Sequence, residues 1–372
     1  MNATAKGAKS NTMVTERAVL EALATIQDPD LRRDIVSLGF VRDVQIDGGT
    51  VRFAIELTTP ACPVRKQMEE GARQVVAALP GVEQVEVTMT SRVTTSREPQ
   101  SSYLPEVRNT VAVASGKGGV GKSTVAANLA VALMRAGARV GLMDADVYGP
   151  CIPKLMGGGG APQQTEGGKM IPPLMHGVKI MSMAFFLPKN EAVVWRGPML
   201  HKMVQEFLGH VEWGELDYLV IDLPPGTGDI QLSLCQTIPL TGAVIVSTPQ
   251  DVALEVASKA ILMFNKLKTP ILGIVENMSY YACSQCGHRD EIFGHGGAKA
   301  ASEKAEIPFL GEIPLDPYIR RTSDEGRPVA MEPADSPVAK AFHEVAGALA
   351  ARISIANAAA GTLRTAPVVV MR

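Results

Sequence analysis

The sequence is short of cysteine, of long apolar runs and of excess charge, and each shortage excludes a class of protein. Its 372 residues include five scattered cysteines, too few for a disulfide framework. No apolar run approaches the ~18 residues that a membrane span requires. The 36 basic and 38 acidic side chains nearly cancel, which argues against a broad nucleic-acid-binding face. The opening segment MNATAKGAKSNTMVTER lacks the apolar core of a signal peptide. We therefore expect a cytoplasmic protein of about two domains, with no nucleic-acid or membrane partner.

The first 91 residues carry the pattern of a small α+β domain. Apolar positions recur at helical spacing in 14–26 and 64–79. Alternating segments at 40–46 and 50–57 flank the turn sequence DGG, which indicates a hairpin. A third alternating segment covers 82–90. The order predicts an αββαβ domain over residues 14–91.

A polar segment with two prolines at 92–109 shows no apolar period and predicts a linker. Beyond it, apolar strands alternate with helical stretches, which favours an α/β domain over 110–353 with a mostly parallel sheet flanked by helices. The predicted strands cover 110–115, 139–146, 218–226, 242–249, 270–278 and 308–314. A last helix is expected at about 336–353, followed by a poorly ordered Ala-rich tail at 354–372.

The stretch SGKGGVGKST, residues 115–124, predicts a phosphate-binding loop. Gly116, Gly121, Lys122 and Ser123 match G-x-x-x-x-G-K-[ST] between a predicted strand and a predicted helix. Curled glycine backbone turns N–H groups toward phosphate oxygens, and the helix N-terminus adds its positive end. Lys122 is expected to contact the β- and γ-phosphates and Ser123 to ligate Mg²⁺. The alternative is a glycine-rich turn with no ligand. The loop residues expected to contact ATP are Gly116, Lys117, Gly118, Gly119, Val120, Gly121, Lys122, Ser123 and Thr124.

Acidic residues stand where neighbouring parallel strands end, which is where an open sheet forms its ligand crevice. Asp222 closes the apolar run YLVID and is a candidate magnesium-ordering carboxylate, and Asp144 is a second. Asp146 is a candidate for orienting the attacking water, although aspartate is also common as a helix cap or turn residue. No Asn-Lys-x-Asp guanine signature is present, which favours ATP. Asn277, at the end of a late strand, is a candidate adenine contact or a turn residue.

Lys117 is a second lysine in the loop, five residues before Lys122. It lies on the outer limb, badly placed to serve the phosphates of its own chain. A second copy facing the nucleotide would bring Lys117 across the interface, where it would neutralise charge in the transition state as an arginine finger does. This role requires a homodimer. The alternative is an ordinary solvent-facing lysine.

Cys283 and Cys286 form the C-x-x-C motif in ACSQCGH, on a predicted loop after a strand. Zinc and cubane clusters take about four ligands, and the chain has no second such motif. Two chains that pool their pairs would complete a Cys₄ site at a two-fold axis. Spacing alone leaves open an iron–sulfur cluster, structural Zn²⁺ with help from His288, a redox pair, and two unligated thiols.

The remaining cysteines give weaker signals. Cys62, in TTPACPV, precedes a predicted helix, whose N-terminus would lower the thiol pKa and favour a transient cluster-ligand role. It is equally well explained as a small buried residue between prolines. Cys235 has an apolar helical setting and is expected in the core. The six histidines do not cluster, which argues against a histidine metal site.

The segments KGGVGKST, DADVYGP and DLPPGTGD resemble those of the deviant Walker A ATPases, a class that includes nitrogenase iron protein and the MinD and ParA positioning ATPases. The further segments WRGPML, VENMSYYACSQCGHRDEIFGHGG and GEIPLDPYIRRTSDEGRPV are similar to the Mrp/ApbC iron–sulfur carriers. DPDLRRDIVSLGFV and LTTPACPVR resemble the PaaD-like iron–sulfur assembly domain that precedes the ATPase in bacterial Mrp proteins. The resemblance covers about residues 14–350. Cys151 departs from it, because serine is more usual after YGP, and a thiol there is open to oxidation.

The resemblance implies a slow Mg²⁺-dependent ATPase that holds a [4Fe–4S] cluster between two chains and passes it to apoproteins, with assembly scaffolds as further partners. It implies that Lys117 acts in trans, that Asp146 activates water and that Asn277 contacts adenine. The rival is a positioning ATPase with a structural zinc knuckle, which should carry a basic patch or end in a basic amphipathic helix. The tail after 354 holds only two arginines, which counts against the membrane version. A third possibility is a scaffold protein that binds nucleotide but hydrolyses it very slowly.

Overall fold

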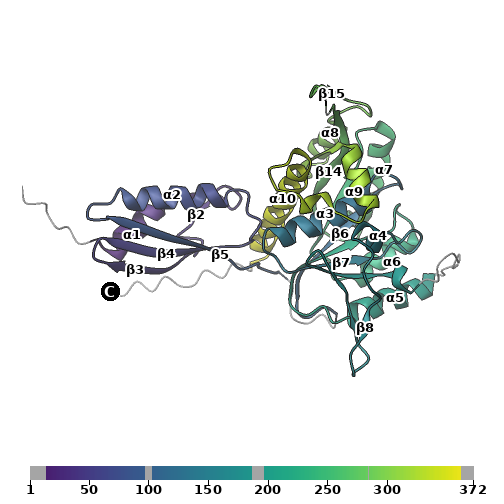
Figure 1. The fold of residues 1–372 in the computed structure, drawn as a ribbon, viewed down its shortest axis with the longest axis horizontal. Helices are drawn as coiled ribbons and strands as arrows, with labels where there is room; N and C mark the ends of the chain where they lie inside the picture. The colour runs from purple at the N-terminus through teal and green to yellow at the C-terminus, as the bar shows by residue number, and fades with distance from the viewer. Residues whose placement is uncertain (1–13, 97–102, 187–196, 284, 362–372) are drawn as a thin grey trace, which may run out of the picture.

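The computed structural model describes residues 14–96, 103–186, 197–283 and 285–361, which form two domains (Figure 1). The predicted tail and the middle of the predicted linker lie largely outside these residues. The front domain contains α1 (Glu16–Leu23), β1 (Gln27–Asp28), β2 (Arg33–Asp34), β3 (Val41–Asp47), β4 (Thr50–Leu57), α2 (Arg65–Ala77) and β5 (Gln84–Ser91). Strand β4 is antiparallel to β3 and parallel to β5. The predicted αββαβ order is therefore present, with two short extra strands.

Alternation along β4 builds the front-domain core. Val51, Phe53 and Ile55 are buried together with the apolar faces of α1 and α2, because successive strand residues point to opposite sides of a sheet. Helix α1 begins after a capping residue, Thr15, whose hydroxyl accepts a hydrogen bond from the Ala18 amide at 3.2 Å.

The second domain is a twisted sheet in the order β10-β11-β7-β12-β6-β13-β14-β15, with β16 beside β14. Its strands are β6 (Val107–Ala114), β7 (Val140–Asp144), β10 (Leu174–Met175), β11 (Val178–Ser182), β12 (Leu216–Asp222), β13 (Gly242–Ser247), β14 (Ile271–Ala282), β15 (Arg289–Asp290) and β16 (Phe309–Leu315), and β8 (Gln163–Gln164) and β9 (Met170–Ile171) form a separate hairpin. Only β10 and β15 run antiparallel to their neighbours in the large sheet. The mostly parallel sheet is as predicted.

Helices cover both faces of this sheet, as its nearly continuous apolar strands require. They are α3 (Lys122–Arg135), α4 (Ile152–Leu155), α5 (Gly197–Gly209), α6 (Asp229–Thr237), α7 (Asp251–Lys266), α8 (Gly297–Lys304), α9 (Pro317–Asp324) and α10 (Pro337–Ala359), with 3₁₀ turns at Met183–Phe185 and Val329–Met331. Helix α3 is buried on almost every side. None of the helices among the described residues combines the length and the apolarity needed to cross a bilayer.

Helix α10 is longer than the sequence predicted, ending at Ala359 and not near residue 353. The extra turns hold Asn357, which is fully buried. Its side-chain nitrogen donates to Thr94 O at 2.9 Å, and its side-chain oxygen accepts from the Ser96 amide at 3.1 Å. The start of the predicted linker is therefore fixed against the second domain, and the end of it belongs to β6.

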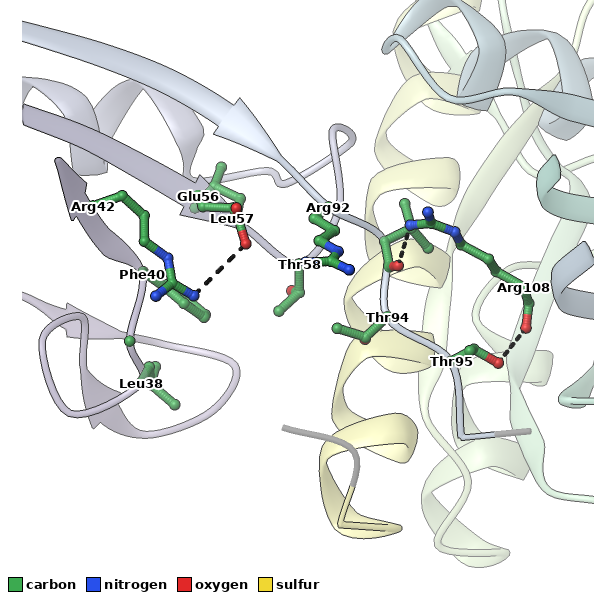
Figure 2. A pocket seen from close by; sticks show the side chains of 12 residues that line it. Leu38, Phe40, Arg42, Glu56, Leu57, Thr58, Arg92, Thr94, Thr95 and Arg108 are labelled. Carbon is green, nitrogen blue, oxygen red and sulfur yellow. Dashed lines mark hydrogen bonds and ion pairs between the residues drawn. The ribbon is translucent and has the colours of Figure 1, made fainter. Parts of the chain in front are cut away.

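The two domains meet along α10 and the N-terminal ends of β6 and β12. Tyr218 donates a buried hydrogen bond of 3.0 Å to the Thr59 hydroxyl. Ala61 packs against the core of the second domain, and Gly347 of α10 leaves room for its carbonyl. A groove of about 530 Å³ remains beside this contact, into which Arg42, Arg92 and Arg108 project (Figure 2).

Candidate functional site

The predicted phosphate loop joins β6 to α3 at the C-terminal edge of the sheet. Gly119 and Gly121 both have φ of +81°, a left-handed conformation that favours glycine. A Cβ at Gly118 or Gly119 would meet nothing within 4 Å, so this limb of the loop is open to a ligand. Ser115 O accepts from the Gly226 amide at 2.9 Å, which ties the loop to the segment after β12.

Lys122 points into a group of acids at the ends of β7 and β12. Its Nζ lies 2.6 Å from Asp222 Oδ1, 3.7 Å from Asp146 Oδ2 and 3.3 Å from Ser123 Oγ. Lys122 and Asp222 are 6% and 0% exposed, and a charge buried this deeply needs a partner. The structure therefore brings together Lys122, Ser123, Asp146 and Asp222, which the sequence had placed in one site.

Asp222 keeps one oxygen free. Its Oδ2 is buried and accepts no hydrogen bond from the described residues, although an unpartnered buried carboxylate oxygen is costly. Burial raises the pKa of Asp222, and the Lys122 ammonium opposes that rise. Magnesium prefers such hard oxygen ligands. The Ser123 hydroxyl and Asp222 Oδ2 therefore fit the predicted magnesium site, and their role in holding the ion stays a prediction.

Asp144 organises the loop that follows β7. One of its oxygens accepts from the Asp146 amide at 3.1 Å, and the other from the Ile152 amide at 3.1 Å and the Ser182 hydroxyl at 2.9 Å. Burial, with the negative charge of Asp222, raises the pKa of Asp144 to about 7. The sequence did not indicate Ser182, because its strand β11 was not predicted. Asp144 as a direct magnesium ligand also stays a prediction.

Asp146 lies at the mouth of the same site. Its Oδ1 accepts from the amides of Tyr148 and Gly149 at 3.3 and 3.4 Å, which holds the side chain in a turn. Its other oxygen, Oδ2, lies 3.7 Å from Lys122 Nζ. Both descriptions in the sequence prediction, a turn residue and a group that orients water, are compatible with this position.

Lys117 and Asn277 differ in how they are held. The Lys117 side chain is half-buried and makes no ion pair or hydrogen bond with the described residues, so its amine is available to another molecule. Asn277, on β14, donates 2.8 Å to Val120 O, and its amide fills the space where a Cβ on Gly121 would lie. Asn277 therefore contacts the phosphate loop directly, and its predicted contact with adenine stays a prediction.

The C-x-x-C motif forms the tip of the β14–β15 hairpin. The Cys283 amide donates 2.9 Å to His288 O, and Gly287 N donates 2.8 Å to Cys283 O. Cys283 is partly exposed and Cys286 exposed. The amides of Gln285 and Cys286, with the Cys286 thiol, lower the pKa of Cys283 by hydrogen bonding to its sulfur. A turn that stabilises thiolate in this way suits a soft metal.

In the part of the chain that the structure describes, no third metal-ligating side chain joins this thiol pair. Among the described residues, the one cluster of three candidate ligands is Glu276, His295 and Glu312, and neither cysteine belongs to it. The hairpin does not bring His288 together with both thiols as a third member of such a set. Among the described residues, the two thiols therefore have no third ligand beside them, and the pooling of two pairs stays a prediction.

The expected activation of Cys62 is wrong. Cys62 lies two residues before Val64, the N-cap of α2. Burial is the largest influence and raises the pKa of Cys62 to about 11, and a hydrogen bond from the Val64 backbone opposes this rise only in part. Cys235 is buried in the core, as predicted. Cys151 precedes α4 beside Ser123, and burial raises the pKa of its thiol as well, which makes it less reactive than its position suggested.

A P-loop NTPase is the class that this fold and loop define, and comparison with known proteins narrows the class. The family model described as NUBPL iron-transfer P-loop NTPase matches residues 106–350. A second model, described as iron–sulfur cluster assembly protein, matches residues 16–88. The chain belongs to the NUBPL iron-transfer P-loop NTPase family, with an iron–sulfur assembly domain in front, which confirms the resemblance seen in its motifs.

Relatives match along most of the chain. The iron–sulfur cluster carrier protein of Deinococcus radiodurans is 50% identical over 91% of this chain and 95% of its own. The carrier protein of the same description from Escherichia coli is 40% identical over 90% and 91%. The solved nucleotide-binding protein of Archaeoglobus fulgidus, in complex with ADP, is 46% identical, covers 62% of this chain and 91% of its own, and has a TM-score of 0.56.

Proposed function

We propose that the protein is an ATP-dependent carrier that holds a [4Fe–4S] cluster between two copies of the chain and delivers it to apoproteins. The observation that carries this proposal is the preformed but incomplete thiol pair, Cys283 and Cys286, on an iron-transfer P-loop NTPase. Four thiolates from two chains match the ligand number of a cubane cluster. The carrier names of the Deinococcus and Escherichia relatives support this cargo.

ATP would bind at residues 116–124, with Lys122 on the β- and γ-phosphates and the α3 N-terminus behind them. Bound Mg²⁺, held by Ser123 and Asp222, would neutralise phosphate charge. Water oriented by Asp146 attacks the γ-phosphorus, the bond to the β-phosphate oxygen breaks, and ADP and phosphate leave. Lys117 of the second chain would stabilise the charge that develops on the transferred group.

Hydrolysis would act on the cargo by changing how the two chains are arranged. The phosphate loop and the cysteine hairpin both lie at the C-terminal edge of the sheet, and Asn277 on β14 contacts the loop. A rearrangement of the dimer at the loop would therefore also move the pooled cysteines. Loss of one chain's pair would leave a cluster with half its ligands, ready for an acceptor protein.

The competing proposal is a positioning ATPase whose hairpin binds zinc. Anaerobic reconstitution with iron and sulfide, followed by iron, sulfide and zinc assays and a visible spectrum, separates the two. The carrier account predicts a brown protein with about four irons per dimer by ligand counting. Stoichiometric zinc with no uptake of iron and sulfide would refute it and favour the positioning ATPase.

A further inference from the structure

The hairpin that carries the two cysteines has little intrinsic support. Strand β15 is two residues long and makes only two pairs with β14, Tyr281 with Asp290 and Ala282 with Arg289. An isolated two-stranded hairpin is marginally stable in water. Something else must hold its tip if the cysteines are to meet a second pair in a fixed geometry.

Arg289, the first residue after the turn, provides such a hold. Its guanidinium carbon lies 3.6 Å from the centre of the Tyr280 ring, over its face. Its Nη2 is 2.6 Å from His295 Nε2 and 3.3 Å from Glu312 Oε2. One side chain thus links β15 to β14, β16 and the loop before α8. We call Tyr280, Arg289, His295 and Glu312 the arginine bracket.

His295 contacts both Arg289 and the acids around it. Its Nε2, which faces Arg289, also lies 3.1 Å from Glu312 Oε1, and its Nδ1 lies 3.6 Å from Glu291 Oε1. A guanidinium can only donate, so the Glu312 carboxylate accepts from Arg289, and His295 lies in contact with both.

The bracket shares its supports with the nucleotide site. Glu276, fully buried beside Asn277, accepts from the amides of Gly296 and Ala298 at 2.9 and 2.7 Å and so fixes the start of α8 next to His295. Glu276 also pairs in register with Glu312 across β14 and β16. The strand that contacts the phosphate loop through Asn277 thus also holds the bracket.

We propose that Arg289 is a positioning residue that fixes the cysteine hairpin to β14 through Tyr280, His295 and Glu312, and that the hairpin thereby follows the nucleotide site. The first part, the positioning role of Arg289, concerns the protein without a bound cluster. The second part rests on the proposed carrier function.

The first part is tested by hydrogen–deuterium exchange on metal-free protein, read on peptides that span the tip of the hairpin. Arg289→Ala should speed exchange there by about tenfold or more, since hydrogen bonds to charged groups are among the stronger ones and local opening sets the rate. Arg320→Ala removes an exposed arginine–aspartate pair on α9 and should leave the hairpin unchanged. Equal exchange in wild type and Arg289→Ala would overturn the proposal.

The second part is read on reconstituted protein. Arg289→Ala should lose its iron to a chelator several-fold faster than wild type, should alter the visible circular dichroism of the cluster and should abolish any effect of ATP on the loss rate, while ATP binding persists. Unchanged loss and unchanged dichroism would overturn the role in cluster holding. Failure of wild type itself to take up a cluster would refute the carrier function, and the exchange experiment would still decide the role of Arg289.

Discussion

At the scale of single residues, the two lysines of the phosphate loop have opposite surroundings. Lys122 is buried among carboxylates, whereas Lys117 has no side-chain partner among the described residues. A phosphate group that enters the loop competes with Asp222 for the Lys122 ammonium. Lys122 therefore serves the nucleotide that is bound to its own chain. Lys117 has its amine left for another chain.

Mixed dimers test this division of roles. Lys122→Ala and Lys117→Ala should each abolish most hydrolysis, as removal of a group that stabilises transition-state charge costs roughly 10²–10³ in rate. A mixture should recover activity, because a heterodimer has one site with both lysines. If subunits exchange and no mixture recovers hydrolysis, Lys117 does not act across an interface.

The raised pKa of Asp144 gives a pH dependence. With its pKa near 7, Asp144 is protonated below neutral pH, so the negative charge beside Asp222 is lost as pH falls. Magnesium binding requires ionised carboxylates. The affinity for Mg²⁺ in the presence of ADP should be about tenfold weaker at pH 6 than at pH 8, since a group of pKa 7 loses about nine-tenths of its charge over that range. Calorimetry would measure the Mg²⁺ affinity at the two pH values, with ADP binding in EDTA as the control. Equal Mg²⁺ affinity at pH 6 and pH 8 would contradict this prediction.

At the scale of elements, the cysteine hairpin is separable from the sheet that forms the nucleotide site. Cys283→Ala and Cys286→Ala should each abolish cluster uptake while leaving the fold and ADP affinity within about twofold of wild type, because surface changes cost little. Calorimetry and circular dichroism on the same samples check both. Cys235→Ala is a poor control because that thiol is buried, whereas the loop residue Gln285→Ala should retain the cluster. Loss of ADP binding in the cysteine variants would show that the hairpin completes the nucleotide site.

Elements with a strong local pattern could be predicted from the sequence, and those decided by distant neighbours could not. The apolar runs of β6, β7, β12 and β13 and the alternation in β4 give each strand within a few residues. Strand β15 is two residues long and exists only because β14 runs past the sheet to meet it. The last turns of α10 form against Thr94, far away in sequence.

Site residues divide in the same way. Lys122, Ser123 and Asp222 were predictable because a loop motif and strand ends place them by local rules, and their contacts confirm that they meet. The environment of Cys62 was not predictable, since its partial burial depends on how it packs against front-domain core residues that lie far away in sequence. Arg289 and His295 gave no signal because nothing in their spacing indicates that they touch.

At the scale of the whole molecule, the front domain is docked on the ATPase domain at the edge of the sheet opposite the phosphate loop (Figure 1). Within a docked chain, Cys62 therefore lies near the N-terminal ends of the strands, whereas the cysteine hairpin follows the C-terminal end of β14. Any transfer between them would require undocking or a second chain.

The Tyr218–Thr59 hydrogen bond tests this docking. Tyr218→Phe removes this hydrogen bond, although the Thr59 hydroxyl still accepts from the Ala61 amide at 3.2 Å. The variant should lower the free energy of unfolding by about 0.5–1.5 kcal/mol in urea unfolding. Tyr148→Phe alters an exposed tyrosine and should have no effect on stability. Equal unfolding curves for Tyr218→Phe and wild type would show that this hydrogen bond does not stabilise the docked arrangement.

Removal of the front domain should leave nucleotide hydrolysis and cluster uptake by the second domain intact. A chain that begins at Pro105 retains the phosphate loop, the acids and the cysteine hairpin, so hydrolysis and cluster uptake should persist. It also loses the packing of Ala61 on the ATPase core, so its melting temperature should fall by several degrees. If the truncated chain stays folded but loses hydrolysis and cluster uptake, the front domain completes a site.

Native mass spectrometry of anaerobically reconstituted protein tests the central claim most directly. Two chains that share four thiolates should appear as a dimer carrying one cluster, about four irons and four sulfides by ligand counting. Collisional activation in the gas phase should release the cluster and separate the two chains in the same step. Cys283→Ala should show neither the cluster nor the cluster-linked dimer. A cluster bound to a single chain, or one zinc per chain with no iron, would contradict the account.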